Sequence, residues 1–416
     1  MTEFTKEFVD KIALSCIQLY NTLPKIGKAV EGEWTVLSCI IQFDTVTKRY
    51  EVVSLGTGSK CIGACKMSPE GDRVHDSHAE VFARRGFMLY LYDNIEKAVV
   101  VKQDQESIFR KENDRFKIRD NLEFIFYSSQ LPCGDASIMP KTNEDDHGSV
   151  VCSLKRDAEG NNCDVESKKI KLETQDIHRT GAKCLPQNEQ DPKEPGTNYH
   201  LLGRVRTKPG RGDRTLSVSC SDKMARWIQV GIQGALLDML LMEPIYIKHF
   251  IFGAGAPYSQ ESLTRALLKR NLGDNDELII PCKPFLYNST AIFHLMKSER
   301  RSRPAPGSIV IVNCGIIEVG VQGKRLGVTK KRAHLKISSL CISKYNIYRR
   351  FVDLLQKDQN LKERLVGEDD LTTIPYNEMK KKSQRYYENW YRVRDSFFKS
   401  WTIKPDMWNF CIKPNT

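Results

Sequence analysis

Three short motifs, far apart in the chain, most constrain how this sequence can fold. They are His78-Ala79-Glu80, Pro132-Cys133-Gly134 and a segment around Cys220 that reads Ser219-Cys220-Ser221-Asp222-Lys223. One imidazole and two thiolates can hold a zinc ion, and an open fourth position is typical of a catalytic zinc site. A carboxylate two residues after the histidine can then move the protons of a water molecule in that position. The sequence therefore predicts a fold that brings His78, Cys133 and Cys220 together, with Glu80 as the catalytic carboxylate.

The three motifs together indicate a zinc deaminase that acts on a nucleobase. Deaminases of this kind usually carry H-x-E followed by P-C-x-x-C, with both thiols close in sequence. Here Ala136 occupies the place of the second cysteine, and Cys220 is the best candidate for the missing ligand. We expect Cys220 to begin a helix, where free backbone N–H groups favour a thiolate. The alternative interpretation is that the cysteines are ordinary buried residues and that Glu80 caps a helix.

The amino-acid composition is typical of a globular protein that binds a polyanion. The 416 residues are 40% hydrophobic and 28% charged, and 64 Lys and Arg against 52 Asp and Glu give a net charge of +12. Nucleic acid is the commonest partner of such a basic chain, although a generally basic surface is the alternative. The start of the sequence contains no signal peptide, and the most apolar stretch, 234–247, is too short to span a bilayer. The 13 cysteines are scattered, so we expect free thiols, an intracellular location in the nucleus or cytoplasm, no membrane contact and no obligate protein partner.

Apolar periodicity predicts alternating helices and strands, and therefore an α/β fold. Helices are expected over 1–28, 79–92, 220–242, 260–270 and 376–400, and strands over 34–43, 50–55 and 121–128. Residues 141–200 are poor in large apolar residues and predict a disordered insertion. The basic run 167–171 inside it could be a nuclear import signal, but a solvated linker is the simpler interpretation.

The motifs resemble those of the adenosine deaminases that act on RNA. The similarity covers most of the chain outside 141–200 and includes the segments 54–62, 132–136, 219–227 and 230–234. Segments 179–184 and 205–215 are similar to the eukaryotic branch that acts on tRNA. The resemblance implies one deaminase domain over 1–416, with a cytidine-deaminase-like mixed sheet flanked by helices and extended by a largely helical C-terminal half.

The same resemblance implies the reaction and its substrate. It implies hydrolytic conversion of adenosine to inosine at position 37 of alanine tRNA, just 3′ of the anticodon. An enzyme that edits other RNAs, or an inactive RNA-binding relative, are the alternatives.

The family also buries an inositol hexakisphosphate. Lys223, Arg226 and Trp227 are spaced i, i+3 and i+4, so they form one helical face with two charges. A buried polyanion would explain charges on a core helix, whereas a solvated basic helix that binds RNA phosphates is the alternative. The resemblance adds these residues to the pocket: Arg84, Arg85, Lys344, Tyr376, Lys380, Tyr386, Trp401 and Lys404. It also implies that Asp76 and Lys208, with Lys223, connect the pocket to the zinc ligands by hydrogen bonds.

Substrate contacts are expected around two loops. Ser59 and Lys60 are expected to line the nucleotide, and Arg211 to contact phosphate. Asp213 stands where the related editors have the Glu that fills the gap left by a flipped base. Basic residues at 297–303 and 324–336 are candidates for binding the rest of the tRNA. The alternative is that they contribute only to solubility.

Overall fold

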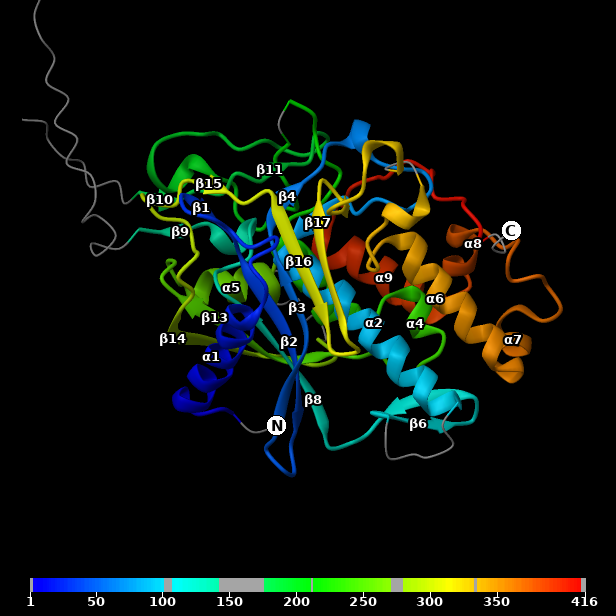
Figure 1. The fold of residues 1–416 in the computed structure, drawn as a ribbon. Coiled ribbons are helices and arrows are strands. Elements are labelled where there is room, and N and C mark those ends of the chain that lie inside the picture. Colours follow the sequence, from blue (N-terminus) through cyan, green and yellow to red (C-terminus); the bar gives the residue numbers. More distant parts are fainter. Residues whose placement is uncertain are drawn as a thin grey trace, which may run out of the picture.

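A mixed sheet forms the centre of the molecule in the computed structural model (Figure 1). The structure describes residues 3–100, 107–141, 176–210, 212–270, 280–332 and 335–412. Eight strands of this part of the chain pair in the order β14-β13-β8-β2-β3-β16-β17-β18. Strands β8, β13 and β14 run parallel to one another, and the other neighbours are antiparallel. Their bounds are β2 Leu37–Asp44, β3 Tyr50–Thr57, β8 Leu122–Ser128, β13 Ile247–Ala254, β14 Phe285–Ile292, β16 Gly307–Val312, β17 Ile316–Val321 and β18 Lys324–Arg325.

Strand β2 is central, so both of its faces are buried. Its first five residues are all buried, which explains its nearly continuous apolar sequence. Ile40 belongs to the larger hydrophobic core. Its neighbours Cys39 and Ile41 belong to a second core on the other face, as the alternation of a strand requires. The sheet therefore separates two layers of packing.

Helices cover both faces of the sheet (Figure 1). Helix α1 (Lys6–Thr22) begins at the capping side chain of Thr5 and packs in the second core. Helix α2 (Ala79–Val100) lies against the other face and contacts β3 and β16. The remaining helices are α3 Cys220–Val230, α4 Ala235–Asp238, α5 Gln260–Leu267, α6 Lys344–Lys357, α7 Gln359–Val366, α8 Tyr376–Lys381 and α9 Gln384–Val393. The predicted mixed sheet flanked by helices, with a helical C-terminal part, is confirmed.

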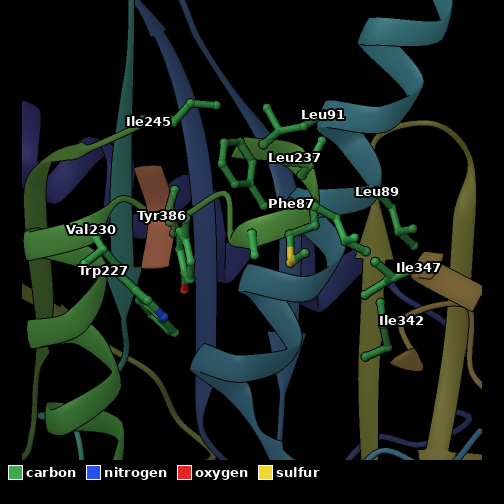
Figure 2. Close-up of a cluster of buried hydrophobic side chains, with 14 of the residues drawn as sticks. Phe87, Leu89, Leu91, Trp227, Val230, Leu237, Ile245, Ile342, Ile347 and Tyr386 are labelled. Carbon is green, nitrogen blue, oxygen red and sulfur yellow. The ribbon is translucent and has the colours of Figure 1, made fainter. Parts of the chain in front are cut away.

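The larger core joins α2 to the C-terminal helices. Figure 2 shows Phe87 of α2, Trp227 of α3 and Tyr386 of α9 in one buried cluster, together with Ile347 of α6. Phe87 has no exposed surface, and Trp227 keeps 6%. The C-terminal helices therefore complete the core over α2 rather than forming a separate layer.

Five short two-stranded pairs lie outside the central sheet in the described residues. They are β1 Glu33–Trp34 with β15 Arg303–Pro304, β4 Ser59–Cys61 with β5 Asp76–His78, β6 Phe109–Glu112 with β7 Arg115–Ile118, β9 Met139–Pro140 with β10 Ile177–His178, and β11 Lys183–Cys184 with β12 Arg206–Thr207. No helix in the described ranges is long and apolar enough to cross a membrane.

Three predicted helices extend well beyond the observed ones. The N-terminal helix ends at Thr22, six residues before the predicted end at residue 28. The helix from Cys220 ends at Val230, because Gly231 adopts a φ of 83° and leaves the helical conformation. The predicted helix 376–400 is divided at Ser383, whose side chain is buried and donates a hydrogen bond to Asp238 in α4. Arg385 donates to backbone carbonyls at the end of the same helix. Tertiary contacts with α4 thus break a stretch that looks helical in sequence.

The prediction of a disordered insertion over 141–200 is wrong for residues 176–200. Residues 142–175 lie outside the described residues. Residues 176–200 are described and contain β10 and β11, with Ile177 and Leu185 buried. Asp191 explains the difference, because both of its carboxylate oxygens accept hydrogen bonds of 2.6 Å from the buried guanidinium of Arg206. A polar segment is thus fixed by a buried ion pair that apolar periodicity cannot reveal.

Candidate metal centre and its surroundings

His78, Cys133 and Cys220 meet at one point in the structure. Their ligand atoms all lie within 4.8 Å of one another. The Nδ1 atom of His78 is 3.5 Å from Sγ of Cys220 and 3.9 Å from Sγ of Cys133. Zinc bonds of usual length at a tetrahedral angle place nitrogen and sulfur about 3.6 Å apart. The donor set and its spacing therefore fit a zinc ion with three protein ligands, as the sequence predicts.

The loop that carries Cys133 packs tightly against the start of α3. Gly134 has a φ of 107°, and a Cβ there would lie 2.2 Å from Oγ of Ser219. This contact explains why glycine follows the ligand. The backbone N–H of Cys220 donates to Sγ of Cys133 at 3.3 Å, and that of Ser221 donates to the Cys133 carbonyl. The N-terminus of α3 thus holds the thiolate ligands in position.

Buried ion pairs fix α3 beneath the site. Asp222 pairs with Arg270, and neither side chain has exposed surface. Asp222 also accepts the backbone N–H of Arg206 at 2.9 Å. Asp135, two residues after Cys133, pairs with Arg265 of α5. Sequence reasoning missed these pairs because each joins segments with no shared motif.

Glu80 lies on the first turn of α2, two residues after the ligand His78. Its residue is 3% exposed, and its Oε2 atom is buried without a hydrogen-bond partner. A buried carboxylate oxygen without a partner is costly unless something absent from the structure uses it. The position of Glu80 therefore fits a group that exchanges protons with a bound water or substrate.

The predicted relay of Asp76, Lys208 and Lys223 is present as a set of contacts. The Nζ atom of Lys208 donates to both carboxylate oxygens of Asp76, at 2.9 and 2.7 Å, and lies 3.0 Å from Sγ of Cys220. Lys223 donates to the same carboxylate. Burial alone would raise the pKa of Asp76, but the two ammonium groups hold the pKa well below its usual range.

The charge of Lys208 also interacts with the two cysteine side chains of the cluster. Burial lowers its pKa, whereas Asp76, Cys220 and Cys133 together raise the pKa well above the usual value. A hydrogen bond with the Cys220 thiol, offset by burial and helped by Lys208, keeps the pKa of Cys133 well below the usual thiol value. The site thus favours negative charge on the sulfur of Cys133, which a metal ligand requires. Burial and the neighbouring Cys133 instead raise the pKa of Cys220 well above the usual thiol value.

A cavity of about 750 Å³ lies away from these residues, between α2, β17 and α6. A second cavity of about 610 Å³ is the one that contains the predicted substrate residues. Ser59, Lys60 and Asp213 line it, together with Ser77, one residue before His78. Arg211 lies outside the described residues. The structure therefore gathers the described members of the predicted nucleotide site around one cavity next to the metal centre.

Other residues of this cavity were not predicted as nucleotide contacts. Arg73 and Pro209 line it, and Arg303 of β15 reaches it from a distant part of the chain. Arg303 belonged to the predicted basic surface, whereas its neighbour Arg301 donates to the carbonyls of Val30 and Glu33. Arg301 therefore supports the fold around β1.

The residues predicted to hold a polyanion also come together. The guanidinium of Arg226 lies 3.6 Å from the ring centroid of Trp390 and 5.7 Å from that of Trp401, and it donates to the hydroxyl of Tyr386. Arg84 lies over Trp227, and Lys380 over Tyr376. Lys344 and Lys404 both lie over Trp408, at 3.9 and 5.7 Å.

The cations of this cluster lack acidic partners. Within the described ranges, no carboxylate lies within 4.0 Å of the charged groups of Arg84, Arg85, Arg226, Lys344, Lys380 or Lys404. The Nε atoms of Arg84 and Arg226 are buried without hydrogen-bond partners. Burial and nearby cations lower the pKa of Lys380 to about 8, and the same causes lower the pKa of Lys344 well below its usual value. Such a group of cations is unfavourable unless an anion joins it.

Comparison with known proteins agrees with this site. A sequence model of the adenosine-deaminase (editase) domain matches residues 54–405. The chain is 34% identical to tRNA-specific adenosine deaminase 1 of Drosophila melanogaster over 412 residues, which cover 97% of both chains. It is 33% identical to tRNA-specific adenosine deaminase 1 of Homo sapiens, over 95% of this chain and 98% of the human one. The double-stranded RNA-specific adenosine deaminase of Mus musculus is 27% identical and matches 98% of this chain but only 33% of its own length.

Proposed function

The chain belongs to the adenosine-deaminase (editase) domain family, and we propose that it converts adenosine to inosine in tRNA by zinc-dependent hydrolysis, with release of ammonia. The observation that carries the proposal is the unpartnered carboxylate of Glu80 beside the cluster of His78, Cys133 and Cys220. Relatives named for activity on tRNA match this chain over nearly their whole length. The likeness of segments 179–184 and 205–215 to the tRNA branch supports position 37 of alanine tRNA as the target. A single domain with a cytidine-deaminase-like sheet is part of the same proposal.

In the proposed reaction, the metal and the protein side chains have different roles. A zinc ion held by His78, Cys133 and Cys220 would supply Lewis acidity that lowers the pKa of a water molecule toward neutrality. Glu80 takes one proton from the water as its oxygen bonds to C6 of adenine, and passes this proton to the ring nitrogen. It then moves the second proton, from the new C6 hydroxyl to the amine, so that the C6–N bond breaks, ammonia leaves and C6 becomes a carbonyl. The positive charge of Lys208 lies 3.0 Å from Sγ of Cys220 and favours the ionised form of this thiol, against the burial and the neighbouring Cys133 that raise its pKa. Ser59 and Lys60, which line the adjoining cavity, would contact the nucleotide.

The buried cationic cluster supports inositol hexakisphosphate as a second bound group. Six phosphates would give Arg84, Arg85, Arg226, Lys344 and Lys380 the acidic partners that the described protein lacks. Lys223, Trp227, Tyr376, Tyr386, Trp401 and Lys404 complete the proposed pocket. The polyanion would then lie one hydrogen-bonded step from Asp76, through Lys223. Denaturing the purified protein and analysing the released small molecules by mass spectrometry tests for this anion.

The function is tested by inosine formation on unmodified total tRNA, detected as A-to-G changes on sequencing. Glu80→Gln keeps the shape of the side chain but cannot accept the proton, and the exposed Glu194→Gln serves as the matched control. We expect one changed position, in alanine tRNA, with wild type and Glu194→Gln but not with Glu80→Gln, and equal zinc content in all three. Inosine at other sites would favour an editor of other RNAs. No inosine from the zinc-loaded wild type would favour an inactive RNA-binding protein.

A further inference from the structure

Asp213 is tied to a distant loop of the described chain. Its Oδ2 atom accepts the backbone N–H of Cys65 at 2.8 Å, across 148 residues of sequence. One residue on, the carbonyl of Arg214 accepts the backbone N–H of Ala64, also at 2.8 Å. The thiol of Cys65 donates to the Asp213 carboxylate as well, which raises the pKa of Cys65. Three hydrogen bonds therefore join the segments 213–214 and 64–65.

The approach of the two segments is close enough to require glycine. A Cβ on Gly63 would lie 2.2 Å from Oδ2 of Asp213 and 2.7 Å from its Cβ. The Asp213 side chain thus packs directly against the backbone of the segment 63–65, where Gly63 has no side chain. The carboxylate has a defined place in the protein without RNA.

The contact between Asp213 and the segment 63–65 forms one side of the cavity beside the metal centre. Gly63, Pro209 and Asp213 line that cavity together with Ser59 and Lys60. The base of the same loop is fixed, because the backbone N–H of Lys208 donates to the carbonyl of Ser217. The side chain of Lys208 in turn lies 3.0 Å from Sγ of Cys220. Lys208 is therefore held next to the metal ligand Cys220, and residues 213–214 are held at the segment 64–65.

We propose that Asp213 is a positioning residue that fastens the segment 213–214 to the segment 63–65 and so preforms the nucleotide cavity for an adenosine that is already unpaired. The proposal rests on the proposed function. An Asp213 side chain committed to the Cys65 N–H cannot enter a base stack without first breaking that bond. The cavity therefore favours adenosine in an RNA loop over adenosine in a duplex, since a loop base needs no replacement in a stack.

The contact itself is tested by thiol alkylation, followed peptide by peptide with mass spectrometry. Cys65 and Cys314 are both exposed, and Cys314 lines the other cavity, between α2, β17 and α6, which does not include Asp213. In Asp213→Ala, Cys65 should react with iodoacetamide at pH 8 about 3- to 10-fold faster than in wild type, because a thiol freed from a carboxylate ionises more readily. Cys314 should react at an unchanged rate. Equal Cys65 rates in both proteins would overturn the contact.

The role in catalysis is tested with one adenosine placed either in a hairpin loop or in a duplex. Asp213→Ala should raise KM for the loop substrate about 10-fold and leave kcat within about 3-fold, as expected for loss of a hydrogen bond that shapes the site. Asp213→Asn, which keeps an acceptor oxygen, should restore KM to within about 3-fold of wild type.

Two results would overturn the positioning role. One is an Asp213→Ala variant that loses more activity on the duplex than on the loop, which would mean that Asp213 acts inside the stack. The other is an Asn variant as defective as Ala. If wild type deaminates neither RNA, the proposed function fails, while the alkylation result still decides whether Asp213 holds the loop.

Discussion

The ammonium of Lys208 lies 3.0 Å from Sγ of Cys220 and donates two hydrogen bonds to Asp76 at the same time. One buried cation thus contacts both a sulfur atom of the metal cluster and a carboxylate two residues before its histidine. Because Asp76 also accepts from Lys223, the cluster is linked directly to the buried cations.

Removal of Lys208 should weaken zinc binding. Lys208→Met keeps the apolar stem but removes the charge that stabilises ionised Cys220, and loss of such supporting contacts typically costs about 10- to 100-fold in metal affinity. Competition with a fluorescent zinc chelator measures the affinity. Lys193→Met, at an exposed lysine, is the matched control. Equal affinity in the two variants would contradict a role for Lys208 at the metal.

A side chain at position 134 should disrupt the ligand loop. Gly134→Ala would force a Cβ to within 2.2 Å of Ser219 Oγ at a φ of 107°, and we expect a loss of about 2–4 kcal/mol in the free energy of unfolding. Gly315→Ala is the control, since Gly315 also has positive φ but nothing within 4 Å of an added Cβ. Urea denaturation measures both. A Gly134 variant no less stable than the Gly315 variant would show that the contact relaxes freely.

Lys380 should make the anion-free protein more stable at high pH. Its pKa in the folded protein is about 8, lowered by burial and by Arg226, Arg84 and Arg85, from an ordinary value of 10.5. The unfolded chain therefore binds more protons between pH 8 and 10.5, so the free energy of unfolding rises across this window, by on the order of 2 kcal/mol.

The comparison for Lys380 uses protein stripped of bound anions. Lys380→Met should flatten the rise between pH 8 and 10.5, whereas Lys382→Met, at an exposed lysine, should leave it unchanged. Added inositol hexakisphosphate should stabilise the wild type most at neutral pH, where the cations are charged. An anion-free protein with the same pH profile in both variants would contradict the assigned pKa.

The pair of Glu123 and His249 should govern stability in acid. His249 donates to the carboxylate of Glu123 at 3.3 Å, and Lys248 donates at 2.7 Å. The hydrogen bond from His249, partly offset by burial and aided by Lys248, lowers the pKa of Glu123 to about 2. The stabilisation is thus present above pH 4.5 and is lost as the pH falls toward 2.

Glu123→Gln should therefore lose about 1–2 kcal/mol at neutral pH, allowing for solvent screening, and should show a shallower decline between pH 4.5 and 2. Urea midpoints across this range measure the difference, with Glu194→Gln as the control. Parallel curves for the Glu123 variant and wild type would contradict the prediction.

Much of the candidate site could be predicted from sequence. A histidine and two cysteines in these motifs, with a glutamate two residues after the histidine, are rarely found together except at a catalytic metal site. The sequence predicts a site of His78, Glu80, Cys133 and Cys220, and the structure brings the three predicted metal ligands together. The buried cations were also anticipated from the charged face of one helix and from resemblance. Helix ends were less predictable, as at Ser383, where contacts with α4 interrupt a pattern that is helical throughout.

The sequence by itself predicted the candidate metal donor set and the proposed catalytic carboxylate, and it determined the excess of positive charge and the alternation of helices and strands. These follow from local pattern and from the chemistry of individual side chains. Tertiary structure alone decided the rest: the pairing of Asp191 with Arg206, the break at Ser383, and the seat of Asp213 on the Cys65 backbone. Each of these depends on a contact between segments far apart in the chain, whose free energy comes from geometry that no local pattern records.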